Sequence, residues 1–322
     1  MIRDCIQTIR QRNPSVLVVG DIMIDEYQRG TSNRVSPESP SLIVDYEETE
    51  CRLGGAANSA SNCVALGGSV AICGVVGADS YADHAEAMLA EARIKHNLLR
   101  SDSRQTTVKT RIVANGQQVL RLDRETRNDL SEVDTSWLIE KATALLPDYD
   151  ILVLSDYAKG VLTSRVCGEI IEKAGSLGKR VVIDPKGNDF RKYAGAFLLT
   201  PNLQETYFFI GEHPSSSQST LEEVIHRLRD GLSLETFVVT RGSEGVSVFE
   251  PEKRAYQMPA RAKKVYDVTG AGDTFIGAVA VAIGAGLSLS DSVFFANEAA
   301  AIVVGKKGTA TVSLQELTGL GD

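Results

Sequence analysis

Residues 150–185 read DILVLSDYAKGVLTSRVCGEIIEKAGSLGKRVVIDP. This stretch holds two short apolar runs, DILVLSD at 150–156 and RVVIDP at 180–185, with a helical pattern from Ser164 to Leu177 between them. Runs that are apolar at nearly every position indicate strands that are covered on both faces. A strand, a helix and a second strand form a βαβ unit, so the stretch predicts two parallel strands joined by a crossover helix.

The same alternation extends along the chain in both directions. Further apolar runs are SVLVVGD (15–21), VAICGVVG (70–77) and TFVVTRG (236–242), and helical patterns cover 80–93, 135–146 and 220–232. We therefore expect an α/β fold with a doubly wound, mostly parallel sheet flanked by helices. Ligands bind such sheets beyond the carboxyl ends of their strands. The residues expected there are Gly20-Asp21, Ser155-Asp156, Asp184-Pro185 and Thr240-Arg241.

Two segments, at about 31–50 and 104–124, interrupt the series by alternating polar and apolar residues. The second contains Asn115-Gly116, a strong signal for a type I′ hairpin. We expect a small antiparallel β lid on a single domain that spans 1–322. One lid face would cover a ligand and the other would form a homodimer, lid to lid. An ideal register puts Lys109, Arg111 and Leu120 on one face and Val108, Ile112 and Val119 on the other.

Composition excludes several classes of protein. The chain has 322 residues, 43% of them hydrophobic, with a net charge of −8 and a pI near 5.2. This charge argues against general binding to nucleic acid or to an anionic membrane, which requires clustered basic residues. The N-terminus carries a charge every few residues, and the most apolar segment falls short of the roughly 20 residues that span a bilayer. We expect a cytoplasmic protein whose five cysteines, without a CxxC pair, are reduced.

The segment DVTGAGDTF, residues 267–275, precedes a run of small apolar residues that reads as a buried helix. Gly270, Ala271 and Gly272 would form the first turn, where unpaired N–H groups create a hole for an anion. Asp273 at the mouth of this hole could accept a proton. Phosphoryl transfer requires both elements. The simpler alternative is that Asp273 only caps the helix after a tight turn.

Four motifs occur in one order: LGGAANSASNCVALGG (53–68), TPNLQE (200–205), VTRGSEG (239–245) and DVTGAGDTFIGA (267–278). In these motifs and their order, nearly the whole chain resembles the ribokinase-like (PfkB) carbohydrate kinases. The segments GDIMIDEY, TSNRVSPESP, LSDYAKG, IDPKGNDF and FFANEAAAIVVGKKGTATVS are also similar to the D-glycero-β-D-manno-heptose 7-phosphate kinases. This resemblance implies ATP-dependent phosphorylation of the anomeric O1 to the 1,7-bisphosphate, in the synthesis of ADP-heptose for the lipopolysaccharide core. Because the sequence ends without an HxGH motif, it resembles the kinase-only form, and a separate nucleotidyltransferase is expected to act later.

The resemblance also implies roles for individual residues. Asp273 matches the general base, and Gly270, Ala271 and Gly272 match the anion hole. Asn202 and Glu205 match the pair that organises Mg²⁺ and the ATP phosphates, with Glu205 acting through water, although a helix-start cap pair is the alternative. The positions that match nucleotide contacts are Thr240, Gly242, Gly245 and Asn297, where the glycines could equally form a plain turn. Asp267 and Thr269 match a monovalent cation site, for K⁺ for example.

For the acceptor, the resemblance assigns sugar contacts to Asp21, Gly54, Gly55 and Asn58. Residues 102–127 contain six basic and three acidic residues, an excess that suits an anionic substrate. The expected ligands of the distal phosphate are Arg34, Lys109, Arg111 and Lys186. A kinase for another sugar or phosphosugar, and a catalytically silent sugar or nucleotide sensor, remain alternatives. A dinucleotide-dependent oxidoreductase lacks its glycine fingerprint.

Overall fold

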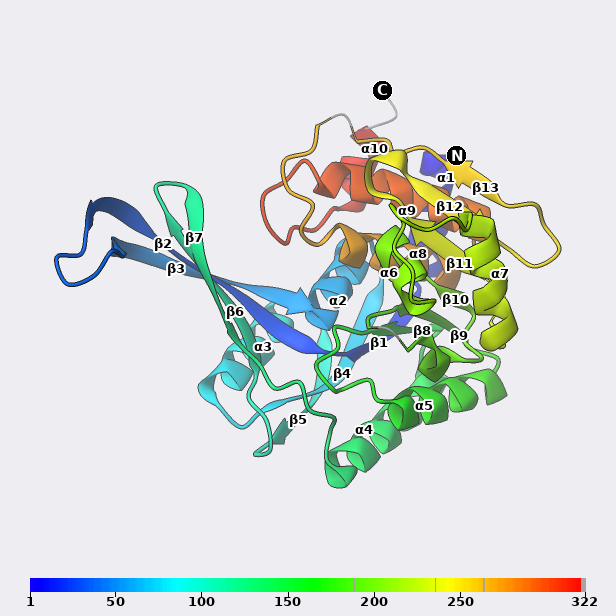
Figure 1. Ribbon diagram of the computed structural model, residues 1–322. Helices are drawn as coiled ribbons and strands as arrows, with labels where there is room; N and C mark the ends of the chain where they lie inside the picture. Colours follow the sequence, from blue (N-terminus) through cyan, green and yellow to red (C-terminus); the bar gives the residue numbers. More distant parts are fainter. Residues whose placement is uncertain (188, 235, 263, 320–322) are drawn as a thin grey trace.

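The computed structural model describes residues 1–187, 189–234, 236–262 and 264–319 (Figure 1). The strands are β1 (Ser15–Gly20), β2 (Ile22–Val35), β3 (Leu42–Gly55), β4 (Ser69–Gly77), β5 (Lys95–Ser101), β6 (Thr107–Ala114), β7 (Gln117–Arg124), β8 (Ile151–Ser155), β9 (Arg180–Asp184), β10 (Leu198–Leu199), β11 (Phe237–Thr240), β12 (Val246–Phe249) and β13 (Tyr256–Met258). The helices are α1 (Ile2–Arg12), α2 (Ala56–Ala65), α3 (Ser80–Glu91), α4 (Glu132–Leu145), α5 (Ser164–Ser176), α6 (Leu203–Phe209), α7 (Leu221–Gly231), α8 (Ala271–Gly284), α9 (Leu289–Val303) and α10 (Leu314–Thr318). Short 3-10 turns lie at η1 (Leu146–Asp148), η2 (Phe190–Tyr193) and η3 (Gly242–Glu244).

Within the described ranges, nine strands form the main sheet in the order β13-β12-β11-β10-β9-β8-β1-β4-β5. The pairs from β10–β11 to β4–β5 are parallel, and β12 and β13 add antiparallel strands at one edge. The predicted α/β class with a mostly parallel sheet is therefore confirmed. The opening unit is present as β8, α5 and β9, in which Val153 lies beside Val182.

Helices cover both faces of this sheet (Figure 1). Alternate residues of β1 separate the two cores, since Val16 and Val18 pack with α1, α2, α8 and α9, while Leu17 and Val19 pack with α4, α5 and α7. This alternation explains why the sequence runs are apolar at nearly every position. The burial on both faces makes the sheet a rigid support for the residues at its strand ends.

The second sheet, which we call the lid, has the strand order β3-β2-β6-β7 and projects from the body (Figure 1). It consists of two antiparallel hairpins that are joined by parallel pairing of β2 with β6. Its first hairpin is longer than the predicted segment at about 31–50, because β2 enters the lid immediately after Asp21. At the base of the lid, Ile24 and Val108 pack against Ala85 of α3.

The predicted register of the second hairpin is wrong beyond its turn. A bulge between Ile112 and Val113 pairs Ile112 with Leu120 and Arg111 with Arg121. A one-residue shift moves side chains to the opposite face of a strand. Leu120 therefore shares the outer face with Ile112, and the inner face, toward the body, carries Lys109 and Arg111 together with Arg121. The bulge therefore moves Leu120 from the face of Lys109 and Arg111 to the face of Ile112, where Arg124 also lies opposite Val108.

Other features agree with the sequence or refine it. The helix expected at 135–146 begins earlier, at Glu132, because the Ser131 side chain caps the N–H of Asp134. All five cysteines are free thiols, and burial raises the pKa of Cys63, Cys73 and Cys167 to about 12. In the part of the chain that the structure describes, no helix is both long and apolar enough to span a membrane.

Candidate active site

The N-terminus of α8 lies at the centre of the candidate site. Gly270 precedes the helix in the left-handed conformation, with φ of 78°, which glycine adopts without strain. The helix packs closely on α2, and a Cβ at Gly277 would lie 3.1 Å from the carbonyl oxygen of Ser59. Small residues therefore allow α8 to sit deep in the core, with its first N–H groups at the end of the sheet.

Asp273 is buried on the first turn of α8, with 5% of its surface exposed. Its carboxylate accepts hydrogen bonds from Asn58 Nδ2 at 2.6 Å and from Ser59 Oγ at 2.9 Å, both on α2. The Tyr157 hydroxyl donates to the same carboxylate. The capping alternative is wrong, because Gly270 is the N-cap and no side chain caps this helix. Asp273 is instead positioned by side chains from two other elements.

Burial raises the pKa of Asp273, and the hydrogen bonds from Tyr157, Asn58 and Ser59 oppose that effect. Burial next to this carboxylate also raises the pKa of the Tyr157 hydroxyl well above its ordinary value. Asp184 at the end of β9 has a strongly raised pKa, caused by burial and then by the nearby charges of Asp273 and Glu205. A buried carboxylate that still receives three donors is suited to accept a proton.

A cavity of about 310 Å³ adjoins the first turn of α8. Ala271 and Gly272 line one end, and Phe275, Ala300 and Val304 give it an apolar wall. The structure brings the predicted nucleotide residues together here, since this cavity is also lined by Thr240, Gly242, Gly245 and Asn297. The Asn297 side chain donates to the carbonyl oxygen of Pro259 at 2.8 Å, which holds the two walls together. An apolar slot that ends at helix N–H groups fits a base and its phosphates.

Asn202 and Glu205 form a capping box at the start of α6. Asn202 Oδ1 accepts from the Glu205 N–H at 2.9 Å, and Glu205 Oε2 accepts from the Asn202 N–H at 3.0 Å. The helix-cap alternative for this pair is therefore confirmed as local structure. The other carboxylate oxygen of Glu205 binds Lys186 Nζ at 2.5 Å, so this oxygen points away from α6 toward the loop after β9.

Asp267 and Thr269 lie beside the loop before α10. The Asp267 carboxylate accepts the N–H of Thr269 at 2.9 Å and that of Gly308 at 2.8 Å. Burial alone would raise the pKa of Asp267, but these two N–H groups lower it overall. The carboxylate therefore remains ionised and ties the segment before α8 to the loop at 305–309.

The predicted sugar contacts divide into two groups. Gly54, Gly55 and Asn58 lie at the junction of β3 and α2, and Asn58 reaches Asp273 directly. Asp21 is placed differently, because its carboxylate is 1% exposed and accepts the N–H groups of Tyr157, Lys159 and Val161. Burial and the charge of Asp156 raise its pKa to about 6. Asp21 thus orders the loop that carries Tyr157, and its oxygens are already engaged.

Asp25 was missed by the sequence analysis. This carboxylate is 3% exposed and binds Arg111 Nη1 at 2.5 Å. A Cβ at Gly54 would come within 2.7 Å of its Oδ2, so the glycine is what leaves room beside it. Its position four residues after Asp21 in GDIMID, on the same strand face as Tyr27, was the available signal. Tyr157 and Ser59 were missed as well, since no pattern placed them beside Asp273.

The cations predicted for the distal phosphate do not form one group. Arg111 binds Asp25, whereas Lys109 lies 3.5 Å from Asp123 and 3.6 Å from Glu125. Lys186 is bound to Glu205, and both line a different hollow that also includes Tyr157. Arg34 is nine residues beyond Asp25 on β2, about 30 Å away by strand rise, and its side chain is 67% exposed. The long lid carries Arg34 away from this chain's own site.

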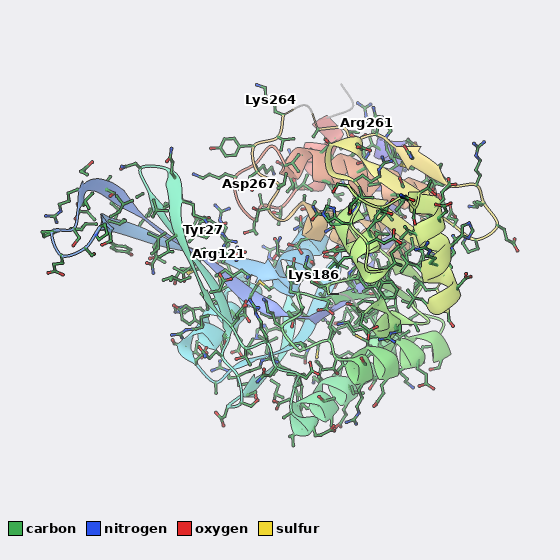
Figure 2. The ribbon with its side chains drawn as sticks, viewed as in Figure 1. Tyr27, Arg121, Lys186, Arg261, Lys264 and Asp267 are labelled. Carbon is green, nitrogen blue, oxygen red and sulfur yellow. The ribbon has the colours of Figure 1, made fainter. Side chains whose placement is uncertain are left out.

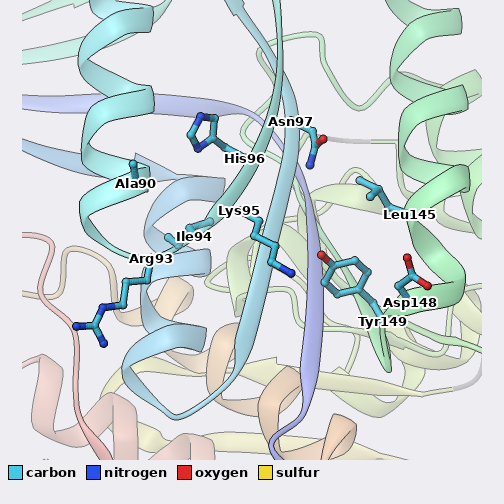
Figure 3. A pocket seen from close by; sticks show the side chains of 9 residues that line it. All are labelled: Ala90, Arg93, Ile94, Lys95, His96, Asn97, Leu145, Asp148 and Tyr149. Carbon is cyan, nitrogen blue, oxygen red and sulfur yellow. The ribbon is translucent and has the colours of Figure 1, made fainter.

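A larger hollow of about 670 Å³ lies elsewhere (Figure 3). It is lined by Ala90, Arg93, Ile94, Lys95, His96, Asn97, Leu145, Asp148 and Tyr149, which come from the end of α3, the start of β5, the end of α4 and the turn before β8. These are the amino ends of parallel strands, whereas ligands of such sheets bind at the carboxyl ends. The position of the hollow therefore does not compete with the site at α8.

Comparison with known proteins agrees with this geometry. The pfkB family carbohydrate kinase profile matches residues 13–317, nearly the whole chain. The chain belongs to the pfkB family. Members of this family are phosphotransferases that use an alcohol group as acceptor. The predicted recognition of a carbohydrate kinase is therefore confirmed at the level of the family.

Among curated proteins, this pfkB member is similar to the bifunctional protein HldE of Chromohalobacter salexigens, at 45% identity over 94% of the chain and 62% of the relative. It is also similar to the bifunctional protein HldE of Sulfurimonas denitrificans, at 39% identity over 96% of the chain and 64% of the relative. The chain thus spans less than two thirds of the length of these relatives.

Among solved structures, phosphofructokinase-2 from Escherichia coli in complex with potassium aligns with a TM-score of 0.79 at 18% identity, covering 95% of this chain and 97% of the other. Ribokinase from Arabidopsis thaliana, complexed with ribose and ATP, aligns with a TM-score of 0.72 at 19% identity, covering 95% and 98%. At these identities the likeness establishes the ribokinase-like fold.

Proposed function

We propose that this pfkB kinase transfers the γ-phosphoryl group of ATP to the anomeric O1 of D-glycero-β-D-manno-heptose 7-phosphate and gives the 1,7-bisphosphate. The observation that carries the proposal is the placement of Asp273. This buried carboxylate receives Asn58, Ser59 and Tyr157 and stands on the first turn of a helix whose N–H groups open into an apolar cavity. Base, phosphoryl site and nucleotide slot are contiguous.

Different residues of the chain accept the proton, stabilise the moving phosphoryl group and orient the base. The Asp273 carboxylate accepts the proton of the O1 hydroxyl as the O1–P bond forms and the bond between the γ-phosphorus and the bridging oxygen of ADP breaks. The N–H groups that follow Gly270 stabilise charge on the equatorial oxygens of the moving group. Asn58, Ser59 and Tyr157 hold the carboxylate in one orientation, so little rearrangement is needed at the moment of transfer.

The residues fit the use of ATP with a divalent cation. Among the described residues, no group of three or more His, Cys, Asp or Glu side chains could enclose a metal ion. Mg²⁺ keeps several waters and binds through few carboxylates and substrate phosphates, so Glu205 would hold it through water beside Asn202. When bound, the ion would neutralise charge on the nucleotide phosphates. Asp267 and Thr269 would support a monovalent cation such as K⁺, the ion named in the phosphofructokinase-2 complex.

The identity of the acceptor is supported by the sequence. The segments GDIMIDEY, TSNRVSPESP and LSDYAKG resemble heptose 7-phosphate kinases, and the HldE relatives match nearly the full length of this chain. The relatives are named bifunctional, and the chain matches 62% and 64% of their lengths, so the proposal assigns the kinase activity to residues 1–322. A nucleotidyltransferase would act on a later intermediate.

Measurement of ADP release with a panel of acceptors tests this proposal. Heptose 7-phosphate should give a kcat/KM well above those for fructose 6-phosphate, ribose and nucleosides. A higher value for another sugar would replace the acceptor but keep the chemistry. No ADP release above background with any acceptor would instead support a sensor and contradict a kinase.

The lid also supports a homodimer. Its outer face exposes Leu120 and Leu122 on β7, at 50% and 53%, and Tyr46 on β3, at 65%, and exposed apolar side chains of this size favour a partner surface. A second copy packed lid to lid would cover them by an isologous contact. Sedimentation of wild type and Leu122→Asp tests this: a dimer that the substitution converts to a monomer supports the proposal, and a wild-type monomer at all concentrations contradicts it.

A further inference from the structure

A further cavity, of about 260 Å³, lies between the inner face of the lid and the loop before α10. The lid contributes Tyr27, Arg29, Arg52 and Arg111, among others, and the body contributes Asp267, Thr269, Lys307 and Gly308. Figure 2 places Tyr27 on the lid and Asp267 on the C-terminal segment that faces it. The cavity is separate from the nucleotide slot, whose lining includes Ala271 and Gly272 but none of these residues.

The cavity has an unusual concentration of positive charge. The guanidinium carbons of Arg29, Arg52 and Arg111 lie 5.5, 5.4 and 5.3 Å from the centre of the Tyr27 ring. Adjacent like charges raise the energy of the folded protein unless an anion offsets them. Within the part of the chain that the structure describes, four cationic side chains line the cavity, with Lys307 as the fourth, against the single carboxylate of Asp267.

The carboxylates near these three arginines do not use all of their N–H donors. Glu50 accepts both Arg29 Nη2 at 3.0 Å and Arg52 Nε at 2.6 Å, and the exposed carboxylate of Glu48 lies 3.6 Å from Arg29 Nε. Asp25 serves Arg111, and Asp267 already accepts two N–H groups. Lys307 is exposed and has no ion pair with any described residue. Each arginine therefore retains N–H donors beyond those its carboxylate uses, because a guanidinium carries five.

Backbone contacts hold the cavity in shape. Arg52 Nη1 donates to the carbonyl oxygens of Lys307 at 2.9 Å and Thr309 at 3.3 Å, which ties the lid to the loop. Gly308 has φ of 68°, and a Cβ there would lie 2.8 Å from Arg52 Nη1 and 3.0 Å from the Tyr27 hydroxyl. Glycine is thus required for the loop to approach the lid this closely.

We propose that this cavity is a phosphate-binding site, separate from the anion hole at α8. A phosphate monoester offers a double negative charge and several oxygens, which planar guanidinium groups bind in pairs. Two sources carry this chemistry: the distal phosphate of the acceptor, which rests on the proposed function, and a free phosphate-bearing small molecule. Of the cations predicted from sequence, Arg111 belongs to this site, whereas Lys109, Lys186 and Arg34 have acidic partners elsewhere.

Titration of the full chain with inorganic phosphate, followed by calorimetry, tests the site directly. Wild type should bind phosphate, and Lys307→Gln and Arg29→Gln should each weaken binding about tenfold, the effect of one lost charged hydrogen bond. Arg121→Gln is the matched control, because Arg121 lies on the same lid face, is 50% exposed and pairs with Asp123 outside the cavity. Absence of phosphate binding by wild type, or equal affinity in the control and both variants, overturns the proposal. Lys307 is exposed, so its variant remains informative if Arg29→Gln fails to fold.

Kinetics then distinguish the two sources. If the acceptor supplies the phosphate, Lys307→Gln should raise KM about tenfold for the phosphorylated acceptor and leave KM for the unphosphorylated sugar unchanged, while inorganic phosphate competes with the acceptor. If a free molecule supplies it, inorganic phosphate should bind without competition. Should the chain bind phosphate at this site yet fail to phosphorylate heptose 7-phosphate, the proposed function would fail and the site would stand.

Discussion

The two sides of Asp273 are built differently. On the side where we propose that the nucleotide binds, the cavity is mainly apolar, and its lining comes from residues 240–304 of the C-terminal part of the chain. On the side where we propose that the acceptor binds, charged residues such as Asp25 and Arg111 come from β2 and β6, which are distant in sequence and meet only in the lid. The nucleotide side thus depends on backbone shape, and the acceptor side depends on the register of a small sheet.

In this account, the residues at α8 carry out the transfer, whereas the charged residues of the lid select the acceptor. Helix N–H groups beside glycines can bind the phosphate of a nucleotide whatever the acceptor of the phosphoryl group is. Charged pairs on the lid can change without disturbing α8, because the lid projects from the body and contacts it through α3 and the loop at 305–309. The same core can therefore serve different acceptors, and substitutions on the two sides should alter different kinetic constants.

The largest effect should come from the residue that both sides share. Asp273→Asn keeps the size of the side chain but removes the base, so kcat should fall about 100- to 10,000-fold with every acceptor. ATP binding should persist, because the N–H groups of α8 remain. Steady-state assays together with nucleotide titration check this. Activity within a few fold of wild type would show that another group accepts the proton.

The nucleotide side can be tested at Gly272. A Cβ at this position meets no protein atom within 4 Å, so Gly272→Ala should increase stability by about 0.5–1 kcal/mol through helix propensity. The methyl group would nevertheless keep the phosphate away from the N–H groups, and kcat/KM for ATP should fall about tenfold or more.

Gly168→Ala is the matched control for this change. Gly168 is an exposed helical glycine in α5 whose Cβ is also free of neighbours. It should give the same gain in melting temperature without loss of activity. Equal activity of both variants would argue that phosphate does not approach Gly272.

The acceptor side can be tested at Asp25. Asp25→Asn removes the charge that holds Arg111 and should raise KM for the acceptor about tenfold, with KM for ATP unchanged. Asp123→Asn serves as control, since Asp123 lies on the same lid face and pairs with Arg121. A rise in KM for ATP alone would contradict the division between the two sides.

The smallest effect should appear in the pH profile. Asp273 has a raised pKa because of burial, and the Tyr157 hydroxyl opposes that rise. Activity needs the ionised carboxylate, so it should be present above this pKa and lost as pH falls through it. Tyr157→Phe removes a donor that lowers the pKa, and the acid limb of kcat/KM should move to higher pH by up to about one unit. A shift to lower pH would contradict the assigned contact.

Much of the nucleotide side could be predicted from sequence because its motifs are local. DVTGAGDTF places Gly270 and Asp273 within one turn, and VTRGSEG places Gly242 and Gly245 in one loop, so short-range geometry determined their positions. Asn202 and Glu205 are also only three residues apart, and a helix-start cap pair was one of the two alternatives that the sequence left open.

The acceptor side could not be predicted as well because it depends on long-range pairing. The bulge in the second hairpin moved Leu120 to the outer face, and the length of β2 carried Arg34 away from the site. The role of Asp21 as a sugar contact stays a prediction, and the sequence did not show that its oxygens accept N–H groups of the loop at 157–161. Only the folded lid shows that Asp25 occupies the place beside Gly54 and Arg111.

A crystal structure with a nonhydrolysable ATP analogue and the acceptor tests the central claim most directly. The claim predicts oxygens of the γ-phosphate about 3 Å from the N–H groups that follow Gly270, with the acceptor hydroxyl in hydrogen-bond contact with Asp273. A γ-phosphate bound away from residues 270–273, with the acceptor hydroxyl beside a different carboxylate, would contradict it.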